Sequence, residues 1–186
     1  MISKDYFGEG KNIEFKQEIP SRHEKFLKDI IAFANTSGGK CVIGIVDETN
    51  EVIGIGDQSP FKLSDSISSM ISDACTPLIE SDIYPDTVEG KTVLVVEVFP
   101  GKQRPYYLAS KTKENSSYIR VNGTSRLADS TTLRELELEG AKLSYDTMQE
   151  IGMAYDEKRL RNYAKKSGRW HYPTVRPRMK GYLLRI

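Results

Sequence analysis

The sequence lacks any long apolar run, and this absence argues first against the membrane-spanning classes. No stretch of the 186 residues approaches the roughly 18 consecutive apolar residues that a membrane helix needs. The N-terminus, Met1 to Gly10, is polar and mixed in charge, without the apolar core of a secretory signal peptide. Apolar residues make up 38% and charged residues 28% of the chain, as in ordinary globular proteins. We therefore expect a globular protein of the cytoplasm.

Cysteine and histidine are also scarce, which argues against redox and zinc chemistry. Cys41 and Cys75 are too far apart for a CxxC motif and are expected to be buried free thiols, and the two histidines lack metal-ligand spacing. A phosphate-binding P-loop is missing as well. Gly90-Lys91-Thr92 resembles the end of one, but Pro85 stands where the first glycine is needed. No serine lies in a GxSxG nucleophile elbow.

What the sequence does contain is an uneven distribution of charge. The net charge is +1, but the two parts of the chain differ in sign. Residues 1–155 have 17 Lys and Arg against 24 Asp and Glu, whereas residues 156–186 have 10 Lys and Arg against 2 Asp and Glu. The basic segment is a candidate handle for phosphate groups, and equally a solvated tail or a linker. We expect a main domain over residues 1–142. Residues 143–186 would form a helical, basic extension or the start of a following domain.

Hydrophobic periodicity predicts interleaved strands and helices. Apolar runs of strand length occur at 12–17, 41–46, 51–55, 83–88, 92–99, 105–108 and 117–121. Helical spacing of apolar residues begins at Arg22, at Pro60 and after Asp129, and is weaker over 145–166. The run at 41–46 is apolar on both faces and is expected in the centre of a sheet. The predicted fold class is α/β or α+β, a mixed sheet of about five or six strands with helices packed on it.

Residues 101–126 concentrate side chains of the kinds that bind nucleic acid. Cations outnumber acids six to one, and three tyrosines are interleaved with them. The cations are Lys102, Arg104, Lys111, Lys113, Arg120 and Arg126, and the tyrosines are Tyr106, Tyr107 and Tyr118. Cations pair with phosphates and aromatic rings stack on bases, so this segment is a candidate interface. The structural alternative is an edge hairpin with protective lysines and half-buried tyrosines.

Three blocks of sequence together resemble one known family. The first is Ile13-Glu14-Phe15-Lys16, and the second runs from Ile31 through AFANTSGG to Lys40 and continues to Asp47. The third, YIRVNGTSR, runs from Tyr118 to Arg126. In order and spacing they are similar to the Schlafen AlbA-type domain, found in bacterial transcriptional regulators and in the core of Schlafen proteins. The resemblance covers roughly residues 8–135.

The resemblance implies a bacterial DNA-binding domain of a transcriptional regulator. Schlafen members also include endoribonucleases that use three carboxylates, matched here by Glu9, Glu14 and Asp47, the last by its context after a strand. In a nuclease this trio would be catalytic and would hold Mg²⁺ or Mn²⁺. In the structural alternative, Glu14 and Lys16 are outward residues of a strand and Asp47 begins a turn.

Three functions are therefore open. The first is a nucleic-acid-binding domain, with DNA as the expected ligand, that contacts the backbone through Lys16, Lys40, Lys102, Arg104, Arg120 and Arg126. The second is the metal-dependent endoribonuclease, and only then is a cofactor expected. The third is a protein-interaction or dimerisation module. The expected partners are nucleic acid, and then a second copy of the chain or a following domain, but no membrane.

Overall fold

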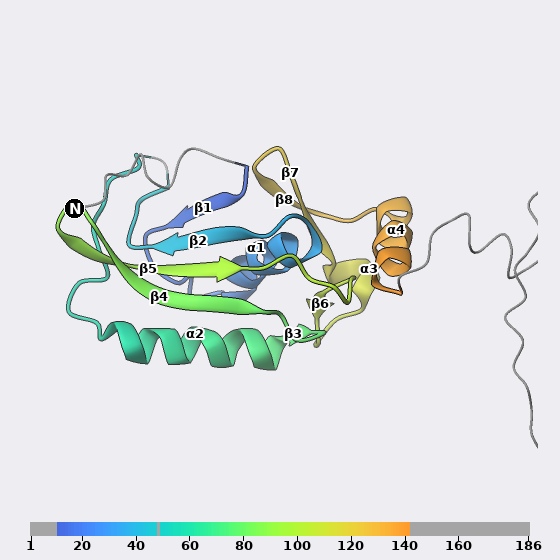
Figure 1. The fold of residues 1–186 in the computed structure, drawn as a ribbon, viewed down its shortest axis with the longest axis horizontal. Helices are drawn as coiled ribbons and strands as arrows, with labels where there is room; N and C mark the ends of the chain where they lie inside the picture. Colours follow the sequence, from blue (N-terminus) through green and yellow to red (C-terminus); the bar gives the residue numbers. More distant parts are fainter. Residues whose placement is uncertain (1–10, 48, 142–186) are drawn as a thin grey trace, which may run out of the picture. The chain divides into compact units, whose positions relative to one another are not determined.

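The computed structural model describes residues 11–47 and 49–141, and a four-stranded mixed sheet forms their centre (Figure 1). The strands lie in the order β1 (Ile13–Lys16), β2 (Gly39–Ile43), β5 (Lys91–Val98) and β4 (Ser81–Val88). β1 pairs in parallel with β2, and the other two pairings are antiparallel. β2 lies inside the sheet, as its two-sided apolar pattern predicts, and β1 is an edge strand.

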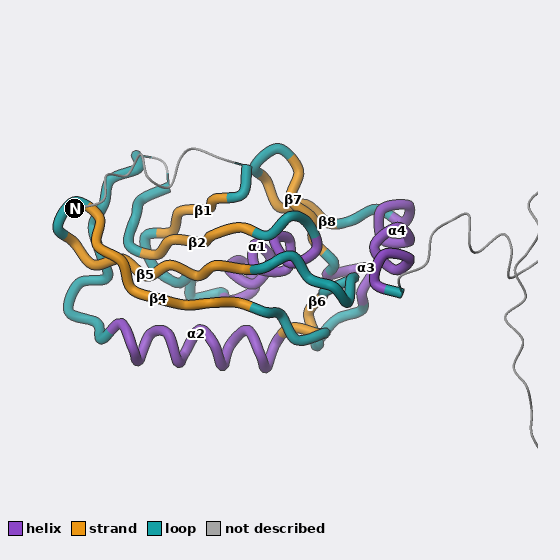
Figure 2. Tube along the Cα trace, viewed as in Figure 1, coloured by secondary structure: helices purple, strands orange, loops and turns teal. Residues whose placement is uncertain are grey.

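Two long helices share a buried core with this sheet. α1 (His23–Asn35) contributes Phe26 and Ile30, and α2 (Pro60–Ala74) contributes Ile67 and Ile71. α1 packs against β2 and β5, while α2 runs along β4 (Figure 2). A second buried cluster gathers valines of β2, β4 and β5 with Phe15 of β1 packed against it. The sheet is therefore apolar on both faces, which is why its inner strands read as continuous apolar runs.

Shorter elements complete the described part of the chain. β3 (Cys75–Thr76) pairs with β6 (Tyr107–Leu108), and β7 (Tyr118–Val121) pairs with β8 (Thr124–Leu127). α3 (Lys113–Ser116) precedes β7, and α4 (Ser130–Gly140) follows β8. The predicted class, helices packed on a mixed sheet, is confirmed.

The main sheet has four strands rather than five or six. β6 and β7 do not join it because they pair with β3 and β8 in two separate two-stranded sheets. The strand predicted at 51–55 reduces to one bridge, between Ile45 and Val52. The helix predicted from Arg22 begins one residue later, with Arg22 as its N-cap.

Asn35, the last residue of α1, joins this helix to the segment that follows β5. Its side chain is buried, and Nδ2 donates to the carbonyl oxygens of Tyr106 and Tyr118, each at 2.9 Å. Its Oδ1 accepts from the backbone N–H of Tyr106 at 2.7 Å. One amide thus satisfies three backbone groups that helix and sheet leave unpaired. These bonds fix the starts of β6 and β7 against the end of α1.

The two cysteines are buried free thiols, as predicted. Burial raises the pKa of the Cys75 thiol to about 12 and also raises the pKa of the Cys41 thiol. Both thiols are therefore protonated at neutral pH, and neither has the thiolate character of a nucleophile or metal ligand.

The last described helix begins after Asp129, where the sequence predicts the start of helical spacing. Asp129 accepts a hydrogen bond from the backbone N–H of Thr132 at 2.8 Å, and α4 follows. The helix predicted over 145–166 and the basic extension lie outside the described residues, so the boundary after residue 142 stays a prediction. Across residues 11–47 and 49–141, no helix has both the length and the apolar character needed to cross a membrane.

Candidate nucleic-acid interface

A groove of about 900 Å³ lies beside β1. Its walls come from four regions that are distant in sequence: β1 with the residues before it, α1, the segment after β2, and the turn between β7 and β8. Among the described residues that line the groove, cations outnumber acids. The cations are Lys11, Lys16, Lys25, Lys28 and Arg120, and the acids are Glu14, Asp29 and Asp47.

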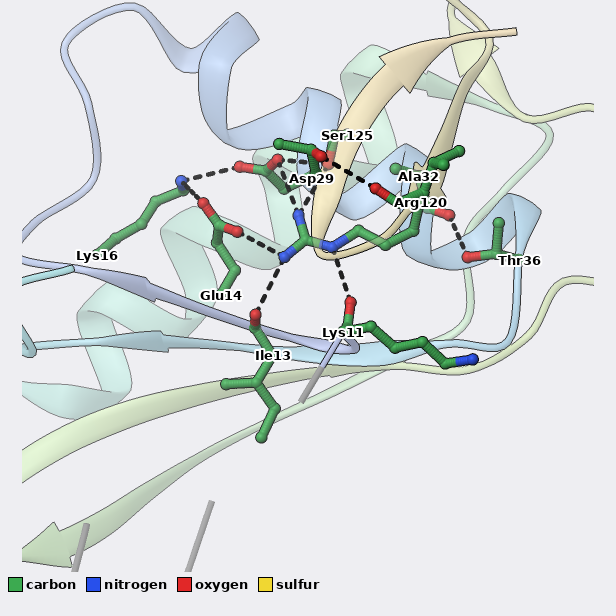
Figure 3. Close-up of polar contacts among 11 residues, drawn as sticks. Lys11, Ile13, Glu14, Lys16, Asp29, Ala32, Thr36, Arg120 and Ser125 are labelled. Carbon is green, nitrogen blue, oxygen red and sulfur yellow. Dashed lines mark hydrogen bonds and ion pairs between the residues drawn. The ribbon is translucent and has the colours of Figure 1, made fainter. Parts of the chain in front are cut away.

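The floor of the groove is a network of paired charges (Figure 3). Lys16 Nζ lies 3.1 Å from Glu14 Oε1 and 2.8 Å from Asp29 Oδ2. Arg120 donates to Glu14 Oε2 at 2.7 Å, and the Ser125 hydroxyl donates to Asp29 Oδ1 at 2.7 Å. The four charged side chains keep between 4% and 19% of their exposure. Two cations and two carboxylates thus balance each other, as buried charges require.

Local structure explains how this network assembles. Glu14 and Lys16 alternate with Ile13 and Phe15 along β1, so the charged pair shares one face of the strand and the apolar pair the other. Asp29 is buried on α1, although it is an acid. Because β1, α1 and β2 form a continuous βαβ unit with parallel strands, the carboxylate of α1 faces the charged side of β1.

Lys16 remains an ammonium group throughout the physiological range. Burial tends to lower the pKa of Lys16, but the hydrogen bond and negative charge of Asp29, with Glu14, outweigh it and raise the pKa above its ordinary value of 10.5. A lysine whose pKa is raised by folding stabilises the fold fully below its unfolded pKa, and this contribution is lost only as the pH rises through the folded pKa. The Lys16 pairing therefore persists beyond pH 10.5.

Three further lysines lie at the rim of the groove. Lys11 precedes β1, and Lys25 and Lys28 lie three residues apart on α1, a spacing that places both on the same face. None of the three makes an ion pair with another residue of the described part of the chain. Lys28 Nζ lies 5.7 Å from the centroid of the Tyr118 ring, and Lys11 and Lys25 are exposed. The rim is therefore a source of uncompensated positive charge.

Comparison with known proteins gives the family. Residues 9–129, more than half of the chain, match the family model described as Schlafen, AlbA_2. The chain belongs to this family. Among solved structures, the DIP2311 protein from Corynebacterium diphtheriae is similar over 73% of this chain and 28% of its own, at 22% identity and a TM-score of 0.51.

A second solved structure has comparable similarity. The N-terminal domain of a RecG-related protein from Nitrosomonas europaea matches 69% of this chain and 94% of its own, at 22% identity and a TM-score of 0.48. This chain spans only 28% of the length of the Corynebacterium protein. At 22% identity, the similarity between this chain and the Corynebacterium protein shows a shared fold and nothing more.

The six basic residues predicted as contacts do not gather in one place. Lys16 and Arg120 line the groove, but both are committed to carboxylates. Lys40 lies 3.2 Å from Glu97, and Arg104 lies 2.7 Å from Glu139. Lys102 and Arg126 are exposed and lie outside the groove lining. The rim lysines Lys11, Lys25 and Lys28 were not among the predicted contacts.

The predicted carboxylate trio of this Schlafen AlbA_2 protein is described only in part. Glu9 lies outside the described residues, while Glu14 and the exposed Asp47 line the same groove. Asp29, which was not predicted, is the acid that joins Glu14 in the floor. Both oxygens of Glu14 already have cationic partners, and residues 11–47 and 49–141 contain no group of three or more potential metal-binding side chains. The described members of the trio, Glu14 and Asp47, therefore do not form a metal site by themselves.

The tyrosines predicted to stack on bases lie elsewhere. Tyr106 is only 4% exposed and belongs to the core, so its ring is not available to a ligand. Tyr107 and Tyr118 are half-buried, and neither lines the groove. This part of the segment follows the structural alternative, in which the rings contribute to packing.

Proposed function

We propose that the chain is a nucleic-acid-binding domain that holds the sugar-phosphate backbone of DNA in the groove beside β1. The rim carries this proposal: Lys11, Lys25 and Lys28 have no carboxylate partner in the described part of the chain, whereas the acids Glu14 and Asp29 have cationic partners. Unpaired ammonium groups along a groove match the charge of a phosphate backbone. The family's usual description supports DNA as the ligand and a role within a transcriptional regulator.

The negative charge of residues 1–155 would help to orient the ligand. Residues 1–155 carry 17 Lys and Arg against 24 Asp and Glu, yet the described residues that line the groove include five cations and three acids. A positive groove on an acidic body attracts a polyanion at one place and repels it elsewhere. Binding is therefore expected in a defined orientation.

The groove is suited to the backbone rather than to the bases. Its one aromatic lining residue among those described, Phe15, packs against the valine cluster of the sheet. Stacking on aromatic rings is worth about 1–3 kcal/mol per base in single-strand binders, and the described lining of this groove offers no exposed ring to supply it. We therefore expect duplex DNA to bind more tightly than a single strand, with little sequence preference.

Salt dependence is the direct test. If each rim lysine neutralises one phosphate, the logarithm of the affinity for a labelled duplex should fall with the logarithm of salt concentration with a slope of about −2.7, near −0.9 per contact. Fluorescence anisotropy over about 50–200 mM salt measures this slope. Binding that does not respond to salt contradicts the proposal. No binding at physiological salt would instead favour the protein-interaction module.

A metal-dependent nuclease is a second candidate because Glu14 and Asp47 line the same groove. Asp47→Asn is the sharper variant for this test, since Asp47 is exposed and outside the ion-pair network, whereas changing Glu14 would also disturb Lys16 and Arg120. The protein is incubated with structured RNA and duplex DNA in Mn²⁺ or in EDTA. Metal-dependent cleavage that Asp47→Asn abolishes would establish the nuclease. Bound but uncut nucleic acid would favour the binding domain.

A further inference from the structure

Arg120 is almost completely enclosed, although it lies on β7 beside the groove. Its side chain keeps 4% of its exposure, and its guanidinium carbon lies 4.9 Å from the centroid of the Phe33 ring. Its ion pair with Glu14 measures 2.7 Å, and Asp29 is 3.7 Å away. A phosphate would have to displace these carboxylates to reach it.

The hydrogen bonds of Arg120 join the start of β1 to β8 (Figure 3). Nε donates to the carbonyl oxygen of Lys11 and NH2 to that of Ile13, each at 3.0 Å, while NH1 donates to the Ser125 hydroxyl at 3.0 Å. The two carbonyls belong to β1 and the residues before it, and Ser125 belongs to β8. Through Glu14 and Asp29, the same guanidinium also connects β1 and α1.

These bonds hold two walls of the groove. One is the turn between β7 and β8, where Asn122 and Gly123 have positive φ of 48° and 79° and line the groove. The other is the start of β1, which bears the rim lysine Lys11. We infer that Arg120 is a positioning residue of the nucleic-acid site. It holds the β7–β8 turn and Lys11 at the spacing that the sugar-phosphate backbone of DNA requires, and it does not touch the ligand. This inference rests on the proposed function.

Lysine at this position separates positioning from simple charge. The planar guanidinium presents five N–H donors in a fixed fork, whereas an ammonium group has three donors at one point and cannot span the same partners. If Arg120 contacted phosphate as a charge, Arg120→Lys would keep most of the affinity and Arg120→Gln would lose it. If Arg120 positions the walls, both variants should weaken duplex binding to a similar degree.

The experiment compares Arg120→Lys, Arg120→Gln and the control Arg134→Gln, an exposed arginine of α4 outside the groove. Duplex affinity should fall at least about fivefold in both Arg120 variants, with a salt slope changed by less than the roughly 0.9 expected for a lost phosphate contact. Arg134→Gln should bind as the wild type does. Wild-type affinity in Arg120→Lys would overturn the inference. A salt slope that falls by the roughly 0.9 of one phosphate contact in Arg120→Gln, but not in Arg120→Lys, would overturn it as well.

A milder variant keeps the test decisive if the Arg120 variants do not fold. Ser125→Ala removes the hydroxyl that links Arg120 to Asp29 but leaves every charge in place. It should weaken duplex binding about threefold with an unchanged salt slope, because no phosphate contact is removed. Unchanged affinity in this variant would overturn the inference.

Amide hydrogen exchange separates this inference from the proposed function. In the Arg120 variants that fold, or otherwise in Ser125→Ala, the amides of residues 122–125 should exchange faster than in the wild type and in Arg134→Gln. This readout needs no ligand. If the wild type fails to bind DNA, the proposed function fails, and unchanged exchange in the variants would overturn the positioning role separately.

Discussion

Replacing Asn35 by alanine is expected to destabilise the domain by about 3–5 kcal/mol, a large part of the roughly 5–15 kcal/mol that holds a typical domain folded. The substitution removes the partner of three backbone groups, the N–H and carbonyl of Tyr106 and the carbonyl of Tyr118. Each buried group left without a partner costs about 1–3 kcal/mol. Chemical denaturation followed by circular dichroism measures the free energy of unfolding.

The matched control is Asn115→Ala. Asn115 is exposed, and its amide donates to the hydroxyl of Thr112 at 3.2 Å. Its loss should change the free energy of unfolding by no more than about 0.5 kcal/mol. Asn35→Asp adds a second comparison, because it keeps the acceptor for the Tyr106 N–H but replaces both donated bonds with a buried carboxylate. Equal stability of the Asn35 and Asn115 variants would contradict this role for the amide.

Elements whose apolar residues recur with a regular period could be predicted from the sequence. α1, α2, β2 and β5 each bury a face or both faces in the core, and the same residues produce the pattern. Periodicity does not identify a family, whereas the three sequence blocks did. The match of residues 9–129 to the Schlafen, AlbA_2 family model confirms that resemblance. The role of Asn35 could not be predicted in this way, because the partners of its side chain lie 71 and 83 positions further along the chain.

β8 could not be predicted from apolar alternation because three of its four residues are exposed. Its position depends on the Asn122-Gly123 turn, in which both residues have positive φ. Asn-Gly between two strands is a strong hairpin signal, so the sequence did contain evidence for β8 in its turn rather than in the strand.

The roles of the charged residues depend on partners from other elements. Lys16 and Arg120 were predicted as phosphate contacts, yet both are bound to carboxylates in the groove floor. One of these carboxylates belongs to Asp29, which lies among the buried residues of α1. An acid on the apolar face of a helix needs a cationic partner, and that signal was available. The sequence did not show which cation would pair with Asp29, because this pairing joins α1 to β1 and β7.

Reversing both rim charges of α1, Lys25→Glu with Lys28→Glu, is expected to lower the affinity for duplex DNA at least about 50-fold near 0.1 M salt. A slope of about 0.9 per phosphate contact corresponds to roughly eightfold per lysine at that concentration, and reversal adds repulsion. The salt slope should also fall by about 2.

The fold should survive this double change, which makes it a test of binding. Lys25 is exposed, and the Lys28 ammonium lies 5.7 Å from the centroid of the Tyr118 ring, a contact worth about 0.5–1 kcal/mol. The control is Lys62→Glu, an exposed lysine of α2 outside the groove, which should bind duplex nearly as the wild type does. If the double variant and the control lose affinity equally, attraction is spread over the whole surface and the groove beside β1 is not the interface. If the double variant alone loses both affinity and slope, the lysines of α1 contact the phosphates, because a change in overall charge would act on both variants.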